Sequence, residues 1–352
     1  MRAEVVALTG RTEDATTIAR AARLICSGRL VVFPTETVYG LGANALDEAA
    51  VARIFDAKGR PAGDPLIVHV ADTADVAAVV AHVPAVARAL MAAYWPGPLT
   101  LILPRGSAVP LRVTGGGATV AVRMPKHPVA LALIRAAGVP IAAPSANRFS
   151  RPSPTRAADV VEDLGELVDM ILDGGATTHG VESTVVDVSG ETPMVLRPGA
   201  ITLESLRELV PEIALRTSVA PDAHAAQISP GTLLKHYSPR ASVRLWTGEP
   251  ESRRRAVRAD VAQLLESGHR VGVLLSDEDV AELSSAGVVT ASLGAEHNLA
   301  EVAARLFAAM RDLDRAGVDV IVTRDFGRSG MGLAIWDRLY RAAEGRVLES
   351  QA

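Results

Sequence analysis

The chain has 352 residues, of which 49% are hydrophobic and 22% are charged. That composition supports packed hydrophobic cores and excludes a wholly disordered chain, and the length favours two domains. The formal net charge of -4 and the aromatic content of 3% argue against a broad basic surface, or a platform of stacked rings, for nucleic acid. Cys26, the single cysteine, excludes an internal disulfide and a multi-cysteine zinc site.

The start of the chain does not resemble a secretory signal peptide, because acidic, glycine and threonine positions precede any long apolar run. The longest apolar stretches, around 76–95 and 128–143, are each interrupted by an arginine and a proline, whereas a membrane span needs about 20 mostly apolar residues. We therefore expect no membrane segment. Cysteine usage that suits a reducing compartment favours a cytoplasmic protein.

Residues 1–210 alternate apolar β-type runs with Ala-rich stretches of helical period. Strands are expected within 30–35, 65–71, 99–104, 119–125, 139–145, 168–175 and 183–189, and helices within 16–28 and 129–138. This alternation predicts an α/β domain.

Residues 211–239 contain four prolines and no sustained period, which predicts a linker. In residues 240–352 regular patterns return, with strands expected within 241–248, 269–276, 288–294 and 318–326 and helices within 251–268, 278–287 and 298–317. Strands that alternate with helices predict a smaller, Rossmann-like domain with a parallel, doubly wound sheet.

The common nucleotide and hydrolase motifs are missing from the sequence. It has no GxxxxGK[ST] phosphate loop and no GxGxxG after the first strand, which argues against standard kinase and dinucleotide-binding folds. It also has no HExxH, CxxC or GxSxG, so zinc peptidase and α/β-hydrolase chemistry lack their ligands or nucleophile.

Polar residues instead follow several of the expected strands, where an open α/β sheet places its ligand crevice. Each one has a plain structural explanation, since turn hydroxyls usually cap backbone groups and surface arginines usually do nothing specific. Together they bring cations and hydroxyls to several strand ends with few balancing carboxylates, as an anionic nucleotide would require. The residues are Thr35, Glu36, Thr37, Tyr39, Lys58, Arg60, His69, Arg123, Lys126, Ser145, Asn147, Arg151, Ser153, Thr155, Ser183, Thr184 and Arg197.

The order and spacing of these strings across residues 10–210 resemble the YrdC family. The matching strings are FPTETVYGLGANA, KGRP, PLIVHV, WPGPLTLIL, AVRMPKHP, PSAN followed by RPSPT, GVESTVVD and LRPG. The K-x-R of Lys58 and Arg60, combined with the S-x-N of Ser145 and Asn147, is specific to that family. The linker string KHYSP and the second domain resemble the longer, two-domain threonylcarbamoyl-AMP synthases within it. The resemblance implies a twisted, open, mixed sheet with helices for the first domain.

The resemblance also implies a reaction, in which L-threonine, bicarbonate or CO2, and ATP give L-threonylcarbamoyl-AMP and pyrophosphate. This product would feed the threonylcarbamoylation of a tRNA adenosine by a separate transferase. A carbamate oxygen would attack the α-phosphorus, so the protein would need positioning and charge neutralisation without a covalent nucleophile. That requirement fits a site rich in Arg, Lys, Ser and Thr. Whether tRNA itself is bound is left open.

Roles follow from the resemblance, motif by motif. Residues implied to bind L-threonine are Thr35, Thr37, His69, Arg123, Ala143 and Ser183. Residues implied to bind ATP are Lys58, Arg60, Thr119, Ser145, Asn147, Ser153 and Arg197, with Lys58 and Arg60 as the catalytic cations. Tyr237 is added to the ATP contacts by the expectation that the linker folds over the site. Mg2+ is expected with the triphosphate, although the sequence names no protein ligand for it or for any other metal.

Two alternatives stay open at this point. A carbamoyl-adenylate-forming enzyme of the hydrogenase-maturation type is similar over the first domain, but that type normally carries acylphosphatase and zinc-finger parts that this sequence lacks. A double-stranded-RNA or ribosome-binding protein without catalysis is the other alternative, and the acidic net charge and scarce aromatics argue against it.

Three expectations follow for the site. The small residues Ala142 and Ala143 favour a small β-hydroxy amino acid, with serine as the weak competitor of threonine. Lys58 and Arg60 should be exposed loop cations that add little to stability. The linker should fold over the first domain as a lid, with Tyr237 and Lys235 or His236 contacting the nucleotide. A simple tether remains the alternative for this segment.

Overall fold

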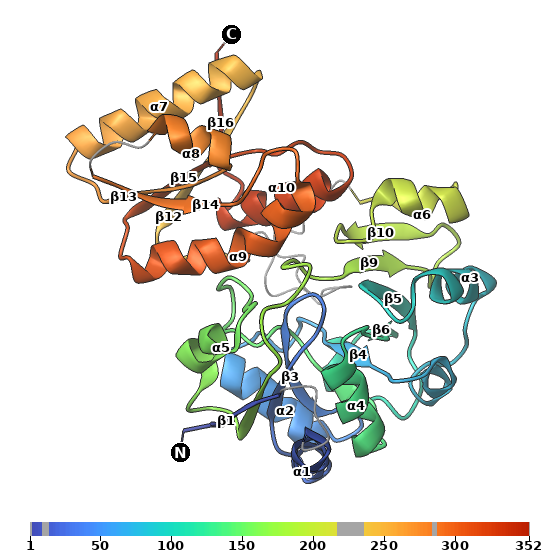
Figure 1. Ribbon diagram of the computed structural model, residues 1–352. Helices are drawn as coiled ribbons and strands as arrows, with labels where there is room; N and C mark the ends of the chain where they lie inside the picture. Colours follow the sequence, from blue (N-terminus) through green and yellow to red (C-terminus); the bar gives the residue numbers. More distant parts are fainter. Residues whose placement is uncertain (1, 9–13, 217–235, 284–286, 352) are drawn as a thin grey trace. The chain divides into compact units, whose positions relative to one another are not determined.

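The computed structural model describes residues 2–8, 14–216, 236–283 and 287–351 (Figure 1). The chain forms two compact units. Unit 1 takes its described residues from Met1–Phe149, Ser153–Thr178 and Glu182–Leu233. Unit 2 takes them from Leu234–Ala352 and from two short segments of the earlier sequence, Ser150–Pro152 and His179–Val181.

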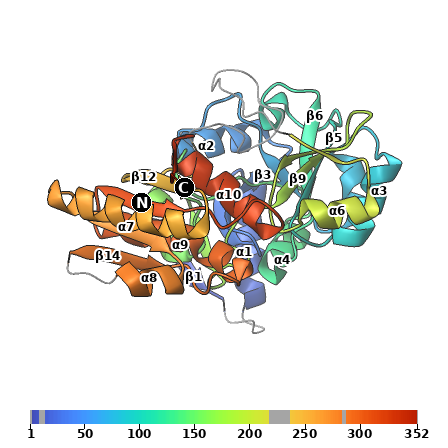
Figure 2. The ribbon, with the colours of Figure 1, turned by 90° about the horizontal axis from the view of Figure 1, so that it is seen from above.

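Unit 1 contains an eleven-stranded mixed sheet in the order β1-β8-β2-β3-β7-β4-β6-β5-β9-β10-β11. Figures 1 and 2 show β5 between β6 and β9. The strands are β1 Glu4–Ala7, β2 Val31–Pro34, β3 Tyr39–Asn44, β4 Ile67–His69, β5 Leu99–Pro104, β6 Thr119–Arg123, β7 Ile141–Ala142, β8 Met170–Asp173, β9 Thr184–Asp187, β10 Met194–Arg197 and β11 Ala214–Leu215. The mixed sheet expected for residues 1–210 is confirmed.

Helices of unit 1 bury apolar faces against this sheet. They are α1 Asp14–Cys26, α2 Glu48–Lys58, α3 Ala85–Tyr94, α4 Pro128–Ala137, α5 Ala157–Leu164 and α6 Leu203–Leu209, with 3-10 turns at Thr73–Ala78 and Leu111–Thr114. The largest hydrophobic core joins Ile54 of α2 to Leu41, Val68, Leu101 and Val122 of four strands. The sequence predicts β2, β4 to β9, α1 and α4, and it misses β1, β3, β10 and the other helices.

Helix α2 has clear end signals, and these fix the position of Lys58. Asp47 caps the start by accepting hydrogen bonds from the amides of Ala49 and Ala50. Gly59 ends the helix in the left-handed conformation with φ 63°, which glycine adopts without a Cβ clash. Lys58 is therefore the last helical residue, and Arg60 follows one glycine later.

Unit 2 contains a five-stranded parallel sheet in the order β14-β13-β15-β12-β16. Its elements are β12 Ser242–Thr247, α7 Pro250–Glu266, β13 Val271–Leu275, α8 Asp277–Leu283, β14 Val288–Ser292, α9 Leu299–Arg315, β15 Val320–Arg324, α10 Met331–Ala342 and β16 Val347–Glu349. Within this unit, Figure 1 shows α7 and α8 on one side of the sheet and α9 and α10 on the other. The predicted Rossmann-like α/β class is confirmed, with α10 and β16 as additions.

The predicted linker is only partly described. Ala214–Leu215 forms β11, which pairs parallel with β10 at the edge of the large sheet. The sheet therefore extends beyond residue 210, the predicted end of the first domain. Residues 217–235 of the predicted lid, including Lys235, lie outside the described residues.

Candidate functional site

Arg123 lies at the centre of a buried polar cluster in unit 1. It is the last residue of β6, paired in register with His69 of β4 and Thr100 of β5. Directly opposite residues of paired strands present their side chains on the same face. The guanidinium donates to Glu36 Oε1 at 2.6 Å through Nη2, to Thr37 Oγ1 at 2.9 Å through Nη1 and to the Gly97 carbonyl at 3.2 Å through Nε.

The turn between β2 and β3 supplies the acceptors of this cluster. Thr35 and Thr37 are both buried, and their hydroxyl oxygens lie 2.8 Å apart. Thr35 Oγ1 also donates to the carbonyl of Val38 at 2.7 Å, which holds the turn closed. The second carboxylate oxygen of Glu36 accepts from the backbone amide of Lys126 at 3.0 Å. The turn is therefore fixed to the end of β6 from both sides.

Two groups of the cluster have shifted pKa values. Burial alone would raise the pKa of Glu36, but the charge and hydrogen bond of Arg123 and two backbone hydrogen bonds lower it below its ordinary value. Burial, and then the charge of Arg123, lower the pKa of His69 to about 3. His69 is thus neutral at physiological pH, and among the described residues its Nδ1 has no hydrogen-bond partner. A neutral ring nitrogen in that state can accept a hydrogen bond from a ligand.

Ser183 connects this cluster to Arg197. It immediately precedes β9, and its hydroxyl lies 2.7 Å from the hydroxyl of Thr100, the residue opposite Arg123. Arg197, the last residue of β10, donates to the Ser183 hydroxyl and to its carbonyl, each at 3.1 Å. The structure therefore brings together Thr35, Thr37, His69, Arg123 and Ser183, as the resemblance implies.

Lys58, Ser145 and Asn147 also come together. The ammonium of Lys58 donates to the backbone carbonyls of Ser145 and Asn147 at 2.6 Å and 2.5 Å. An isolated bridge between Gly40 and Ser145 ties this loop to β3. Ala143, which precedes the loop, is buried, and a Cβ added to Gly40 would meet the Ala143 Cβ at 3.3 Å. The backbone is thus closely packed where the loop leaves β7.

Arg60 is held by the segment that follows it. Its Nε donates to the carbonyl of Asp64 at 3.1 Å, and its Nη2 donates to the carbonyl of Pro65 at 2.7 Å and lies 3.0 Å from Asp64 Oδ1. Lys58 is only 3% exposed and Arg60 8% exposed. The expectation that both are exposed loop cations is therefore wrong, because the helix end and the turn before Asp64 fold both side chains inward.

The remaining predicted ligands are placed differently. Ser153 is buried and donates a hydrogen bond to Glu182 Oε1. Thr119, at the start of β6, lies four residues before Arg123, at the other end of that strand, and is half-buried. Tyr237 belongs to unit 2, where its ring lies 5.3 Å from that of Phe307.

Sequence reasoning assigned no binding role to four residues that contact the predicted ones, although it listed Glu36 among the polar residues at strand ends. Glu36 and Thr100 contact the Arg123 cluster, Asp64 pairs with Arg60, and Glu182 accepts from Ser153. Glu36 stands between two predicted residues in FPTETVYG, and Glu182 directly precedes Ser183, so position in the motif could have indicated both. No local pattern marks Thr100 or Asp64.

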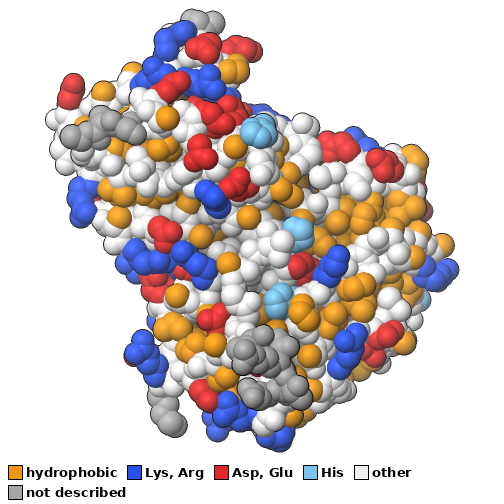
Figure 3. All heavy atoms as spheres, in the orientation of Figure 1, with side chains coloured by type: hydrophobic (Ala, Val, Ile, Leu, Met, Phe, Trp, Pro, Cys, Tyr) orange, Lys and Arg blue, Asp and Glu red, His pale blue; other side chains and the backbone are white. Residues whose placement is uncertain are grey.

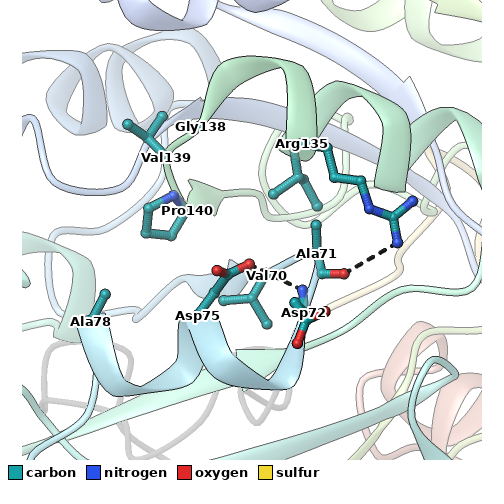
Figure 4. Close-up of a pocket in the computed structure, with 10 residues that line it drawn as sticks. Val70, Ala71, Asp72, Asp75, Ala78, Arg135, Gly138, Val139 and Pro140 are labelled. Carbon is teal, nitrogen blue, oxygen red and sulfur yellow. Dashed lines mark hydrogen bonds between the residues drawn. The ribbon is translucent and has the colours of Figure 1, made fainter.

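A separate pocket of about 400 Å³ opens in unit 1 beyond the end of β4 (Figure 4). Its lining includes Asp72, Asp75 and Arg135 and contains none of the predicted site residues. Asp72 and Asp75 form a capping box for the 3-10 turn that begins at Thr73, and Arg135 donates to the carbonyl of Ala71. These charged groups therefore already have structural partners.

The described residues carry neither a cluster typical of a metal site nor a helix able to span a membrane. Among the described residues, no group of three or more His, Cys, Asp or Glu side chains is arranged to hold a metal ion. Within the same ranges, every helix is too short or too polar to cross a membrane. On the face shown in Figure 3, Lys and Arg side chains are interspersed with Asp and Glu side chains. That face gives no support to a nucleic-acid-binding protein.

The fold and the site define a YrdC-type α/β protein with a second α/β unit. Residues 23–199 match the Sua5/YciO/YrdC family, described as telomere recombination, and residues 201–344 match the family described as the threonylcarbamoyl-AMP synthase C-terminal domain. Threonylcarbamoyl-AMP synthase of Pyrococcus abyssi is 44% identical over 330 residues, which is 94% of each chain. The Bacillus subtilis enzyme is 45% identical over 336 residues, again 94% of each.

A solved structure gives the same result. The crystal structure of P. abyssi Sua5 complexed with L-threonine superposes with a TM-score of 0.92 at 42% identity and covers 100% of both chains. The chain belongs to the threonylcarbamoyl-AMP synthase family, in its long two-domain form. These relatives confirm the predicted enzyme class, a nucleotidyltransferase, and support neither the RNA-binding alternative nor an enzyme of another pathway.

Proposed function

We propose that the chain makes L-threonylcarbamoyl-AMP from L-threonine, bicarbonate or CO2, and ATP, with release of pyrophosphate. The observation that supports this proposal best is the buried arrangement of Arg123, His69 and the two threonines next to the cations Lys58, Arg60 and Arg197, in a chain so similar to threonylcarbamoyl-AMP synthases. One group of residues suits a small polar amino acid, and the other suits phosphates.

In this proposal, threonine binds around Arg123. Three of the five N–H donors of Arg123 serve Gly97, Thr37 and Glu36, and the described residues take up neither of the other two, which we assign to the carboxylate of an amino acid. The Nδ1 of His69 offers an acceptor for a substrate N–H or O–H. Thr35, Thr37 and Ser183 line the same cluster, and Ala143 is the small residue proposed to limit its size. The site therefore favours a short β-hydroxy amino acid.

ATP would bind along Lys58, Arg60 and Arg197, with Ser145, Asn147, Ser153, Thr119 and Tyr237 as the other proposed contacts. Threonine and bicarbonate first give the carbamate with loss of water. A carbamate oxygen then attacks the α-phosphorus, and the bond from that phosphorus to the β-phosphate bridging oxygen breaks. The electron pair leaves with pyrophosphate, so cations that neutralise the phosphates lower the barrier. No side chain has to form a covalent intermediate.

Mg2+ is proposed as a companion of ATP, bound through the phosphates. The described residues offer no three-ligand metal group, and Asp64, the carboxylate beside the cations, is buried against Arg60. The site residues therefore do not form a metal site of their own, and no step here depends on one.

We also propose that the product passes to a separate tRNA threonylcarbamoyl transferase and that the protein works in the cytoplasm. The chemistry supports the first point, because a carbamoyl-adenylate is labile and must be used soon after it forms. Direct binding of tRNA is not part of the proposal.

The experiment that tests the proposed substrates is pyrophosphate release by the full chain with a panel of amino acids. Release should require ATP, bicarbonate and L-threonine together, with serine as a weak substrate, because a pocket discriminates one methyl group by only about 1–3 kcal/mol. Release with leucine or glutamate as efficient as with threonine would contradict the assignment.

A further inference from the structure

Asp64 is a carboxylate enclosed by the cations of the proposed nucleotide site. It lies in the turn between α2 and β4 and is 1% exposed. Its amide donates to the carbonyl of Pro61 at 3.1 Å, and its Oδ1 lies 3.0 Å from Arg60 Nη2. The charges of Lys58 and Arg197 also act on this carboxylate. Its neighbours thus come from the end of α2, from the turn and from the end of β10.

This carboxylate is poorly satisfied by the protein. Neither oxygen accepts a hydrogen bond of good geometry from the described residues. Burial raises the pKa of Asp64, and the charges of Arg60, Lys58 and Arg197 offset only part of that effect. A buried carboxylate that has a close guanidinium but no well-aligned hydrogen bond from the described residues is costly to keep, so its charge calls for an explanation beyond packing.

The charges around Asp64 suggest what that explanation is. Lys58, Arg60 and Arg197 carry three positive charges, and the negative charge of Asp64 offsets one of them. Three uncompensated cations would hold a polyphosphate strongly, and pyrophosphate must leave after every turnover. In a partly buried site one unit charge changes such binding appreciably.

We propose that Asp64 is the internal counter-ion of the nucleotide cations, and that its negative charge weakens the hold on polyphosphate and speeds release of pyrophosphate. This inference rests on the proposed function, because it takes Lys58, Arg60 and Arg197 to be the phosphate-binding groups. Asp64 acts through these cations and does not itself touch the reacting atoms, so it is a positioning residue.

A titration of the full chain with pyrophosphate, and separately with ATP, tests the proposal. Asp64→Asn and Asp64→Ser remove the charge, whereas Asp64→Glu keeps it. Both neutral variants should bind pyrophosphate about tenfold more tightly than the wild type, because one opposing charge is lost. Asp64→Glu keeps the charge and should stay within about threefold of the wild type. Asp56→Asn, on the exposed face of α2, is the matched control and should change affinity less than twofold.

A kinetic comparison separates this role from a structural one. Asp64→Asn should keep its single-turnover rate of threonylcarbamoyl-AMP formation and lose multiple-turnover rate, because release becomes slower. General damage to the site would weaken binding and slow both rates.

Several outcomes would overturn the inference. Unchanged or weaker pyrophosphate binding by the neutral variants would do so, and so would failure of both to fold, since the charge would then serve stability. If the wild type bound neither ATP nor pyrophosphate, the proposed function itself would fail. Wild-type binding without tightening in Asp64→Asn would reject only the counter-ion role.

Discussion

Glu36 accepts a 2.6 Å hydrogen bond from Arg123, and both side chains are buried. The cation expected to clamp the carboxylate of threonine therefore already holds a carboxylate of the chain. The lowered pKa of Glu36 keeps this carboxylate ionised at neutral pH. The pair fixes the orientation of Arg123, and the described residues leave two of its N–H donors unused, so the pair is compatible with the proposed threonine site.

Arg123→Gln should lose both stability and threonine binding. Breaking a buried ion pair leaves Glu36 charged and unpaired, which costs about 3–5 kcal/mol of the free energy of unfolding in urea. The Michaelis constant for threonine should rise more than about tenfold, while that for ATP changes little. The double variant Glu36→Gln with Arg123→Gln should recover part of the stability and none of the threonine binding. Recovery of both would show that Arg123 is only structural.

Lys58→Met should lower stability as well as activity. Each hydrogen bond from the ammonium to the carbonyls of Ser145 and Asn147 is charge-assisted and contributes about 1.5–3 kcal/mol. Thermal unfolding of Lys58→Met beside Arg53→Met, a change on the exposed face of α2, provides the comparison. The control should stay within about 0.5 kcal/mol of the wild type. A melting temperature equal to that of the control would restore the solvent-exposed interpretation of Lys58.

His69 predicts a pH dependence of stability. Its pKa is about 3 in the folded chain and 6.5 at the ordinary value, so the unfolded chain takes up a proton first as the pH falls. The free energy of unfolding should therefore decrease below about pH 6.5, by at most about 1.4 kcal/mol per pH unit from this group. In urea unfolding between about pH 4.5 and 6.5, the free energy of unfolding of His69→Asn should decrease less steeply than that of the wild type. This range lies between the folded and unfolded pKa values of His69. Titration of the His69 ring near pH 6.5 in the folded protein would contradict the prediction.

Tyr237 has both a packing role and a predicted ATP contact. Its ring is 1% exposed, packs against Phe307 and lies 5.2 Å from the guanidinium carbon of Arg338. Tyr237→Phe keeps that packing and removes only the hydroxyl. If the hydroxyl contacts ATP, the Michaelis constant for ATP should rise about two- to tenfold, as expected for one hydrogen bond, with an unchanged melting temperature. Unchanged ATP kinetics would remove Tyr237 from the ATP site.

Local patterns in the sequence predict individual strands and helices better than they predict which of these elements pack or pair together. The apolar runs around Leu101 and Val273 predict strands, because a strand inside a sheet is buried along its length and therefore reads as a continuous apolar run. Edge strand β11, with two residues, is too short to leave a periodic signal. Ser150–Pro152 groups with unit 2 because the Arg311 guanidinium binds the Pro152 carbonyl, a contact across 159 positions that no local pattern encodes.

The same limit applies to the site. Motif resemblance predicted Thr37, His69, Arg123 and Ser183, and the structure brings them together. It gave no indication that Lys58 and Arg60 are buried, because burial depends on the loop after β7 and on the turn at Asp64 closing over them. Asp64 was not predicted because its proposed role depends on the charges of Lys58, Arg60 and Arg197, and the fold brings Arg197 near it from a distant part of the sequence.

Direct detection of the product tests the central claim most sharply. The purified full chain is incubated with ATP, L-threonine and carbon-labelled bicarbonate, and the adenylate fraction is analysed by mass spectrometry, with Lys58→Met as the catalytic control. The account predicts L-threonylcarbamoyl-AMP carrying one labelled carbon, formed together with an equal amount of pyrophosphate and nearly lost in the control. Pyrophosphate release without labelled adenylate, or equal product from Lys58→Met, would contradict it.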